Sequence, residues 1–374
     1  MSLSMTMTTK DNENAAVVLL KGVPIAMANA IRRTVLSNIP VWAIDNVKIT
    51  TNTGPLHCEY VSHRLSLIPV EQPGASSASD YGGVAGYGGY GGYGGVGDED
   101  DYGPFSSGAG RAAAASEPDY SPPDYKTLSE ATYENLTFHI KVKTTQDKTV
   151  EVTTKNITIP ATSDGAAALC KKIFKDEFLI TKLKGKDSAF ECTFKIAQGT
   201  AAKHAKWQAV NTIAYRYCTD TDDEEVSRIQ YDTVSLAQEQ QSARSEPQGF
   251  VFYIEKASLP ISLVLQKALD IIAQTVNVFK TFLLATTVTS WHDGMLEIEY
   301  ESNETHTLGN LLATYGLLQH PGAFIGYRII HPMIKKFILR FKLVETSSFE
   351  EHKMALGSVC DTIMQQTQIL KAML

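Results

Sequence analysis

Residues 24–49, PIAMANAIRRTVLSNIPVWAIDNVKI, decide the fold, because residues 305–330, THTLGNLLATYGLLQHPGAFIGYRII, repeat their plan. Each stretch has a helix-like run, a proline that ends it and an apolar strand-like run. The two stretches align without a gap, with these matches: Asn29 with Asn310, Ile31 with Leu312, Leu36 with Leu317, Pro40 with Pro321, Ile44 with Ile325 and Ile49 with Ile330. We interpret the chain as two related halves, against the alternative of chance similarity.

Hydrophobic periodicity predicts further elements around this repeat. Amphipathic helices are expected over 24–38, 260–285, 306–319 and 350–374. Half-buried antiparallel strands are expected over 136–142, 190–196, 296–300 and 337–343. Each half thus offers two helices with an apolar face, and we expect the four to pack about a pseudo-two-fold axis, as in an isologous dimer.

The net charge of −7 is concentrated in one segment. Residues 73–125 carry eight acids and one base, so the rest of the 374-residue chain balances, with 33 basic and 33 acidic residues. A protein that grips nucleic acid by itself usually has a basic excess. The balance therefore disfavours that class.

The same segment is unusual in composition. It holds 14 of the 26 glycines and seven of the 16 tyrosines but no Ile or Leu, so it cannot bury enough apolar surface to order itself. We expect a disordered loop insertion. A glycine-rich phosphate cradle is less favoured because no Lys and Ser/Thr follow at the required spacing. An acidic magnesium site is also less favoured, because magnesium needs rigidly held ligands.

Three further features bear on the compartment. The longest apolar stretch, 261–285, is interrupted by Lys267, Asp270 and Lys280, which argues against a membrane span. The N-terminal residues show no secretory pattern. The five cysteines are odd in number and scattered, as expected in a reducing compartment. We expect an intracellular protein.

Three stretches carry a family resemblance. Residues 26–70, AMANAIRRTVLSNIPVWAIDNVKITTNTGPLHCEYVSHRLSLIPV, and residues 178–207, FLITKLKGKDSAFECTFKIAQGTAAKHAKW, resemble the third-largest subunit of eukaryotic RNA polymerase II, the archaeal D subunit and the bacterial α subunit. Residues 304–346, ETHTLGNLLATYGLLQHPGAFIGYRIIHPMIKKFILRFKLVET, resemble the eleventh subunit, or archaeal L. The head-to-tail order resembles the polymerases of nucleocytoplasmic large DNA viruses, such as the African swine fever virus group.

The resemblance implies an α+β, α-subunit-like dimerisation fold in two pseudo-symmetric halves, each an antiparallel sheet with two helices, plus an inserted β-rich domain. Residues 15–47 and 205–288 would form the first dimerisation half. Residues 48–204 would form the inserted domain, which contains the 73–125 loop, and residues 289–374 the second half.

The implied function is that of a non-catalytic assembly subunit, a scaffold that docks the large catalytic subunits of a DNA-directed RNA polymerase. The implied partners are the largest and second-largest subunits and small tenth- and twelfth-subunit homologues, with DNA and RNA reached only through the complex and no membrane involved. For a viral protein, the host cytoplasm or nucleus and the virion are the expected locations.

Residue roles follow from the pattern and the resemblance together. Adjacent Arg32 and Arg33 point about 100° apart on their helix, so they cannot both face the core. The resemblance implies that they contact a large subunit, against the plainer interpretation of a solvated helix face. The expected pseudo-dimer interface comprises Asn29, Ile31, Val35, Leu265, Ile272, Phe279, Leu308, Gly309, Asn310, Leu312, Val359 and Ile363.

Within that interface, Gly309 in a helix interior suggests a close backbone approach, and we expect Gly309→Leu to impair association of the halves. Each asparagine is expected to hydrogen-bond to a loop or across the pseudo-dimer.

The motif HAKW supplies His204, Lys206 and Trp207. No suitably placed acid or nucleophile accompanies them in the sequence, which disfavours catalytic histidine chemistry. The resemblance implies an exposed loop that contacts other subunits, against the alternatives of base stacking and catalysis. The run 219–228, TDTDDEEVSR, is most simply a solvated acidic loop.

Zinc is a point of departure from the family. Relatives often carry a cysteine cluster after the motif equivalent to HRLSLIPV, but no cysteine occurs here between Cys58 and Cys170, and His57, Cys58 and His63 supply only three ligands at unusual spacing. We expect no zinc, no other cofactor and no catalytic residue.

Two other classes compete with the scaffold. A free-standing nucleic-acid-binding protein would use a modest basic cluster of Lys171, Lys172, Lys182, Lys184 and Lys186 and bind DNA with a steep salt dependence. A phase-separating protein driven by tyrosines in 73–125 would lose its function when that segment is deleted, whereas a scaffold would still assemble.

Overall fold

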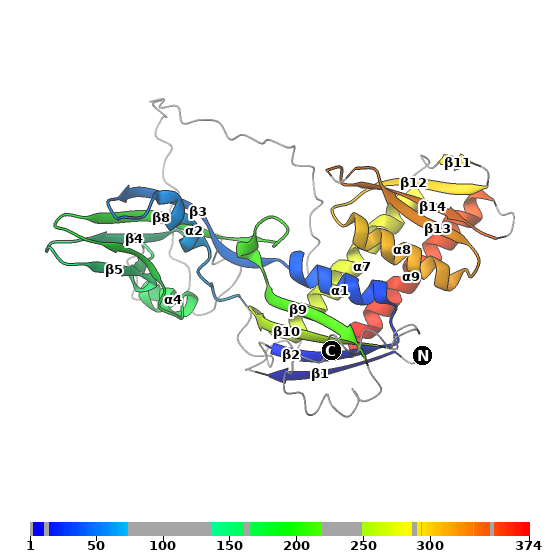
Figure 1. Cartoon of the computed structure of the whole chain (residues 1–374), viewed down its shortest axis with the longest axis horizontal. Coiled ribbons are helices and arrows are strands. Elements are labelled where there is room, and N and C mark those ends of the chain that lie inside the picture. Colours follow the sequence, from blue (N-terminus) through cyan, green and yellow to red (C-terminus); the bar gives the residue numbers. More distant parts are fainter. Residues whose placement is uncertain are drawn as a thin grey trace.

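The computed structural model describes residues 3–10, 15–73, 133, 136–160, 165–218, 249–285, 290–292, 294–331, 333–344 and 348–374. Apart from Pro73, the predicted glycine and tyrosine loop lies outside these residues, and so does the acidic run 219–228. The fold is α+β, as predicted: helices pack against antiparallel sheets, and the described chain forms two bodies joined by a pair of strands (Figure 1).

The larger body, here called the platform, contains two four-stranded sheets. The first has the order β1-β2-β10-β9, and the second has the order β11-β12-β14-β13. The strands of the first sheet are β1 (Ser4–Lys10), β2 (Ala15–Lys21), β9 (Val210–Tyr217) and β10 (Gly249–Ala257). Those of the second are β11 (Ser290–His292), β12 (Met295–Glu301), β13 (Phe324–Ile329) and β14 (Lys336–Lys342).

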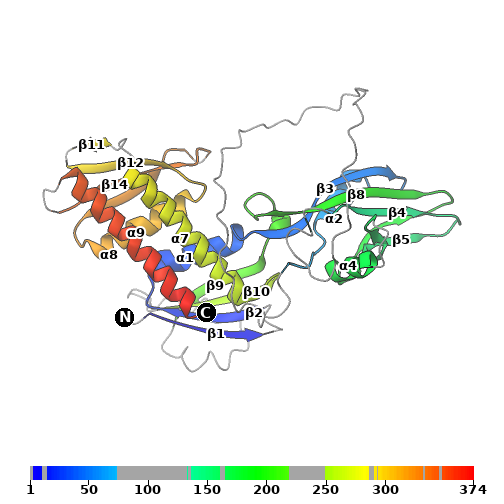
Figure 2. The ribbon, with the colours of Figure 1, turned by 180° about the vertical axis from the view of Figure 1, so that it is seen from behind.

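Four helices fill the space between these sheets (Figures 1 and 2). They are α1 (Ile25–Ser37), α7 (Ile261–Ala285), α8 (Thr305–Gln319) and α9 (Phe349–Ala372). The two longest, α7 and α9, run side by side, while α1 packs against both α7 and α8. All four contribute buried residues to one continuous hydrophobic core.

The smaller body, here called the outer domain, is β-rich. Its main sheet has the order β3-β8-β4-β6, from β3 (Val41–Asn52), β8 (Ala189–Gly199), β4 (Phe138–Lys143) and β6 (Ile157–Thr158). A second sheet pairs β5 (Val150–Thr153) with β7 (Leu179–Leu183). The helical elements are α2 (Cys58–Ser66), α4 (Gly165–Ile173) and the short 3-10 turns η2 (Thr154–Asn156) and η3 (Ala205–Trp207).

The four predicted helices and the four predicted strands are confirmed, with small shifts at their ends. Local chemistry explains the boundaries. Pro24, which precedes α1, has no N–H that a helix start would leave unpaired. At the start of α9, Ser348 accepts a hydrogen bond from the Glu351 N–H at 3.3 Å, and its own N–H donates to the Glu351 carboxylate at 2.7 Å.

One expectation needs correction. By length and composition alone, α7 could cross a membrane. Its three charged residues therefore do not exclude a membrane span, contrary to the expectation from the sequence. Nine of its side chains are nevertheless buried, from Ile261 to Leu283, because they face the neighbouring helices and the first sheet. The apolar character of α7 is thus accounted for by packing within the platform.

Candidate functional site: the helix interface and a groove beside β3

The apolar residues predicted for the pseudo-dimer interface lie together in the platform core. Each is buried, and each fully buried side chain of this size stabilises the fold by roughly 1.5–3 kcal/mol. They are Ile31, Val35, Leu265, Ile272, Phe279, Leu308, Leu312, Val359 and Ile363. Elements from both ends of the chain thus share one core.

Charged residues border the contact between α7 and α9. Asp270 on α7 pairs with Lys371 on α9 at 2.7 Å, and Lys280 on α7 pairs with Asp361 on α9 at 2.7 Å. The four side chains are partly exposed, so each pair contributes modestly to stability. The two pairs run in opposite directions along the helices, which fixes an antiparallel register.

A second polar contact joins α1 to the start of α8. The guanidinium Nε of Arg33 donates to Thr307 Oγ1 at 2.9 Å, and its Nη2 lies 4.0 Å from the Glu304 carboxylate. Arg32 instead donates two hydrogen bonds to Asn29 Oδ1, at 3.2 and 3.0 Å, on its own helix. Of the two arginines predicted to contact a large subunit, Arg33 is therefore bonded to α8, and Arg32 is oriented by Asn29.

Gly309 shows the close approach expected of it. A Cβ atom at this position would lie 2.6 Å from Cδ2 of Tyr327. Tyr327 belongs to β13 of the second sheet, so the close approach lies between α8 and this sheet, and the expected effect of Gly309→Leu on association of the halves stays a prediction. Asn310, the next residue, is half-buried on α8.

A series of hydrogen bonds within the platform was not expected from the sequence. Tyr315 on α8 donates its hydroxyl to Gln366 Oε1 on α9, and the Gln366 amide donates to the Gly22 carbonyl, before α1, at 3.5 Å. Burial raises the pKa of Tyr315. No sequence signal connects these residues, because they are far apart along the chain.

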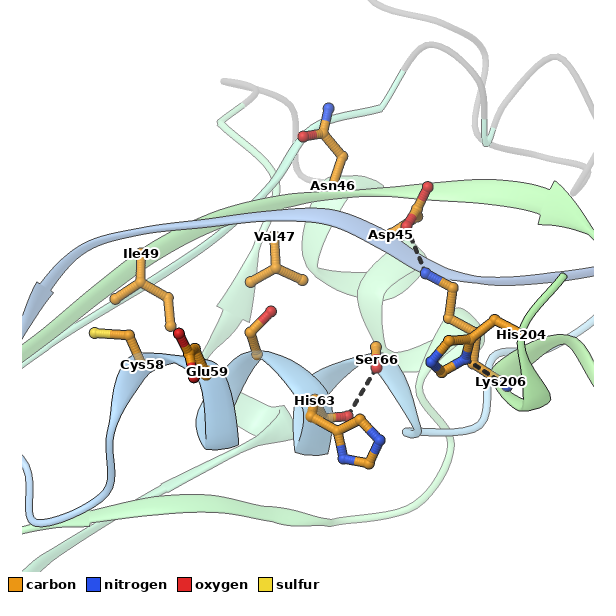
Figure 3. Close-up of a pocket in the computed structure, with 11 residues that line it drawn as sticks. Asp45, Asn46, Val47, Ile49, Cys58, Glu59, His63, Ser66, His204 and Lys206 are labelled. Carbon is orange, nitrogen blue, oxygen red and sulfur yellow. Dashed lines mark hydrogen bonds and ion pairs between the residues drawn. The ribbon is translucent and has the colours of Figure 1, made fainter. Parts of the chain in front are cut away.

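The outer domain carries an open groove of about 500 Å³ between α2, β3 and η3 (Figure 3). Asp45, His204 and Lys206 lie at one end, and Cys58 and Glu59 lie at the other. The remaining lining residues are Asn46, Val47, Ile49, Ser62, His63 and Ser66.

The HAKW residues are less exposed than predicted. The Lys206 side chain is only 10% exposed, because its ammonium pairs with Asp45 at 2.5 Å. Trp207 is half-buried and donates Nε1–H to the Ala197 carbonyl at 3.0 Å. His204 is exposed, as is Ala205, and the His204 Nδ1 accepts the Lys206 N–H at 3.1 Å.

The charge on Asp45 is well supported. Partial burial acts to raise the pKa of Asp45. Burial is outweighed by the hydrogen bonds from Lys206 and the Asn46 N–H and by the electrostatic effect of Lys206 and His204, so the pKa is lowered. Asp45 is therefore held as a carboxylate opposite the Lys206 ammonium.

The donor set does not suit a structural zinc. Among the residues that the structure describes, no three His, Cys, Asp or Glu side chains are grouped so as to hold a metal ion. In the described ranges His57, Cys58 and His63 lie on or beside α2 without a fourth ligand. The expectation of no zinc stays a prediction.

Comparison with known proteins finds family matches in two regions of the chain. The family described as "RNA polymerase Rpb3/Rpb11 dimerisation domain" matches residues 17–276, and a second profile with the same description matches residues 297–372.

Among individual proteins, the chain is 41% identical over 64 residues to the DNA-directed RNA polymerase subunit Rpo3 of Pyrococcus horikoshii, which covers 17% of this chain and 25% of the relative. It is 23% identical over 207 residues to the DNA-directed RNA polymerase II subunit RPB3 of Schizosaccharomyces pombe, covering 55% and 57%. The match thus spans about a quarter of the archaeal relative and just over half of the yeast one.

Proposed function

Because the chain belongs to the RNA polymerase Rpb3/Rpb11 dimerisation domain family, we propose that it is a non-catalytic assembly subunit of a multisubunit DNA-directed RNA polymerase. One observation carries the proposal: the two regions that match dimerisation domains contribute helices to a single core. A dimerisation surface buried within one chain leaves the outside of the platform free to dock other subunits.

The chain would be an intramolecular α-like pseudo-dimer, a fusion of third-largest-like and eleventh-like subunits. The first half would comprise residues 15–47 and 205–288, the inserted domain 48–204 and the second half 289–374. The two sheets support this proposal. Strand by strand, β1-β2-β10-β9 corresponds to β11-β12-β14-β13, and a helix follows β2 and β10 just as one follows β12 and β14.

The partners would be the largest and second-largest polymerase subunits, with tenth- and twelfth-subunit homologues beside them. Arg32 and Arg33 would present their remaining hydrogen-bonding capacity to a large subunit, because a guanidinium has five N–H donors and the contacts to Asn29, Thr307 and Glu304 leave part of them available. Contact with DNA and RNA would come only through the complex.

The fused layout is what links the chain to polymerases of large DNA viruses. On that proposal it would act inside the host cell, in the cytoplasm or nucleus, and would be carried in the virion if the polymerase is packaged. The layout supports this proposal only through the resemblance of residues 26–70 and 304–346 to two separate cellular subunits.

Free-standing nucleic-acid binding is less favoured. Of the predicted basic cluster, Lys182 pairs with Glu151 at 2.7 Å. Two other lysines of the outer domain also face carboxylates: Lys175 pairs with Glu71 at 2.8 Å and Lys141 with Glu191 at 3.3 Å. Paired lysines release few counterions on binding phosphate, so they add little affinity.

Affinity purification tests the proposal. The tagged chain, produced in its native host cell, should co-purify with both large polymerase subunits in fixed proportion, identified by mass spectrometry. The purified chain alone should bind DNA weakly and show no nucleotidyl transfer. Recovery without polymerase subunits, together with tight, salt-sensitive DNA binding by the chain alone, would favour the competing class.

A further inference from the structure

The junction between the platform and the outer domain is narrow. In the part of the chain that the structure describes, β3 and β8 form its sheet, with Val41 opposite Gly199 and Ile44 opposite Ile196 (Figure 1). Val41 is buried in the platform core, whereas the next residue, Trp42, is buried in the core of the outer domain. A two-stranded ribbon is weakly stable by itself, so further contacts across the junction bear on the angle between the two bodies.

Strand β3 is also irregular where it enters the outer domain. Asn46 adopts a positive φ of 50°, and the pairing with β8 shifts register between Asp45 and Lys48. Such a bulge twists and bends the strand. The direction of the outer domain thus depends on what holds Asp45 and its neighbours in place.

The loop 200–208, which contains η3, reaches both bodies across this junction. The Ala202 N–H donates to the Ser37 carbonyl at the end of α1, at 2.9 Å. From the same loop, the Lys206 ammonium pairs with Asp45 beside the bulge at 2.5 Å (Figure 3). One short loop therefore connects the platform to the bulged strand of the outer domain.

Trp207 completes the contact on β8. Its Nε1–H donates to the Ala197 carbonyl at 3.0 Å, and its ring lies directly over Gly199, where a Cβ atom would come within 2.5 Å of Cε2. The Lys206 ammonium lies 4.2 Å from the centroid of the Trp207 ring. Lys206 is thus held between a carboxylate of β3 and an aromatic ring seated on β8, while Trp207 also packs against the platform core.

We propose that loop 200–208 is a strut that fixes the angle between the outer domain and the platform, with Lys206 and Trp207 as its positioning residues. This gives the HAKW motif an intramolecular role. A scaffold that touches a large partner with both bodies binds more tightly when the bodies are already oriented, because less motion is lost on binding. That consequence rests on the proposed function, whereas the strut itself does not.

Distances between spin labels in the full-length chain test the strut. Labels are placed at Lys184→Cys in the outer domain and Met354→Cys on α9, both exposed, in a background with Cys58→Ser and Cys218→Ser. The parent should give one narrow distance distribution by pulsed electron resonance. Trp207→Ala should broaden it roughly twofold, since the ribbon alone resists bending poorly.

Gly199→Ala provides an independent variant, because its new methyl group displaces the Trp207 ring while the side chains of Trp207, Lys206 and Asp45 all remain in the chain. It should broaden the distribution as Trp207→Ala does. Its matched control is Gly326→Ala on β13, where the nearest side-chain atom is 3.9 Å from the new Cβ and the distribution should not change. Lys206→Ala should also broaden the distribution, and Lys206→Arg should restore it because the ion pair with Asp45 is kept.

The outcomes separate the strut from the proposed function. Distributions as narrow as the parent's in Trp207→Ala, Gly199→Ala and Lys206→Ala, each shown by circular dichroism to be folded, would overturn the strut. Failure of the wild-type chain to recover the large polymerase subunits would overturn the proposed function but would leave the distance measurement unaffected.

Discussion

Asp270 of α7 and Lys371 of α9 form an ion pair at 2.7 Å whose reciprocal, between Lys280 and Asp361, is also present at 2.7 Å. In each helix the aspartate precedes the lysine by the same spacing. Adding 91 to the residue number therefore takes Asp270 to Asp361 and Lys280 to Lys371. A two-fold axis between two related helices would produce this reciprocity, which supports the proposed pairing of the halves.

The buried residues of the two helices follow the same shift. Seven positions buried on α7 have buried counterparts on α9. They are Ile261 with His352, Leu265 with Leu356, Ala268 with Val359, Leu269 with Cys360, Ile272 with Ile363, Val276 with Thr367 and Phe279 with Leu370. A shared pattern of core and ion-pair positions is stronger support than either alone.

Charge reversal at Asp361 tests the register of α7 and α9. Asp361→Lys would place a second lysine beside Lys280, and we expect the free energy of unfolding to fall by about 1 kcal/mol, as is typical of partly exposed charges. Adding Lys280→Asp should recover most of the loss, because the pair is restored in reverse. Urea denaturation at low salt measures both changes. Asp147→Lys, on an exposed bend of the outer domain, is the control and should change little.

Two helix glycines form a matched pair for packing. Gly309→Ala would drive its Cβ into Tyr327, at 2.6 Å, and should lower the free energy of unfolding by about 1–3 kcal/mol. Gly357→Ala in α9 meets only Lys280 Cε, at 4.0 Å, so it should raise stability by up to about 1 kcal/mol through helix propensity. Thermal unfolding distinguishes them. Equal changes in melting temperature for both variants would mean that Tyr327 moves aside without cost and that the contact is not tight.

The sequence allowed the platform helices to be predicted because they are long and strongly periodic. The range predicted as 260–285 is α7, Ile261–Ala285, and that predicted as 24–38 is α1, Ile25–Ser37. The short helices α2 and α4 were not predicted, because nine residues give too few turns for a clear apolar stripe.

The contacts of the groove could not be predicted for a different reason. Asp45 and Lys206 are separated by 161 positions, and their ion pair depends on how β3 and β8 align. The HAKW motif is visible in the sequence, but the family resemblance implies an exposed loop and gives no sign of these contacts. Lys206 is covered because it pairs with Asp45 and lies against the Trp207 ring, and neither contact follows from periodicity.

The paired substitution Arg32→Glu with Arg33→Glu tests the proposed large-subunit contact. It removes the bonds to Asn29 and Thr307 and places a carboxylate near Glu304, so the isolated chain should lose no more than about 1 kcal/mol. Recovery of the large subunits in a pull-down should fall strongly. Lys148→Glu, an exposed charge reversal elsewhere, should assemble normally. Wild-type yield from the paired variant would place the contact on another surface.

Gln72 should be the most sensitive polar residue of the outer domain. Its side chain accepts the Trp42 N–H at 2.8 Å and donates to the carbonyls of Trp42, at 2.9 Å, and Val70, at 3.0 Å. Gln72→Ala leaves buried backbone groups unpaired, so we expect a loss of about 1–3 kcal/mol. Exposed Gln146→Ala is the control, and chemical denaturation is the measurement. A loss no larger than the control's would show that water replaces the amide.

Stability should fall at alkaline pH because buried thiols resist ionisation in the folded state. Burial raises the pKa of Cys192 and of Cys360 to about 12, from an ordinary value of 9.0. Below pH 9 both states keep the proton, so the stabilisation is complete. Above pH 9 the unfolded chain loses these protons while the folded chain holds them until about pH 12, and folding is increasingly disfavoured.

Each buried thiol should therefore contribute a slope of up to about 1.4 kcal/mol per pH unit above pH 9. Urea unfolding followed between pH 8 and 11 should show a smaller slope in Cys360→Ala than in the parent, even though the variant starts less stable because of the cavity. Cys58→Ala is the matched control, because it removes an exposed thiol in place of a buried one. If Cys360→Ala kept the parent's slope, the alkaline loss would have to come from other groups, such as the buried tyrosines Tyr133 and Tyr315, whose pKa values burial also raises.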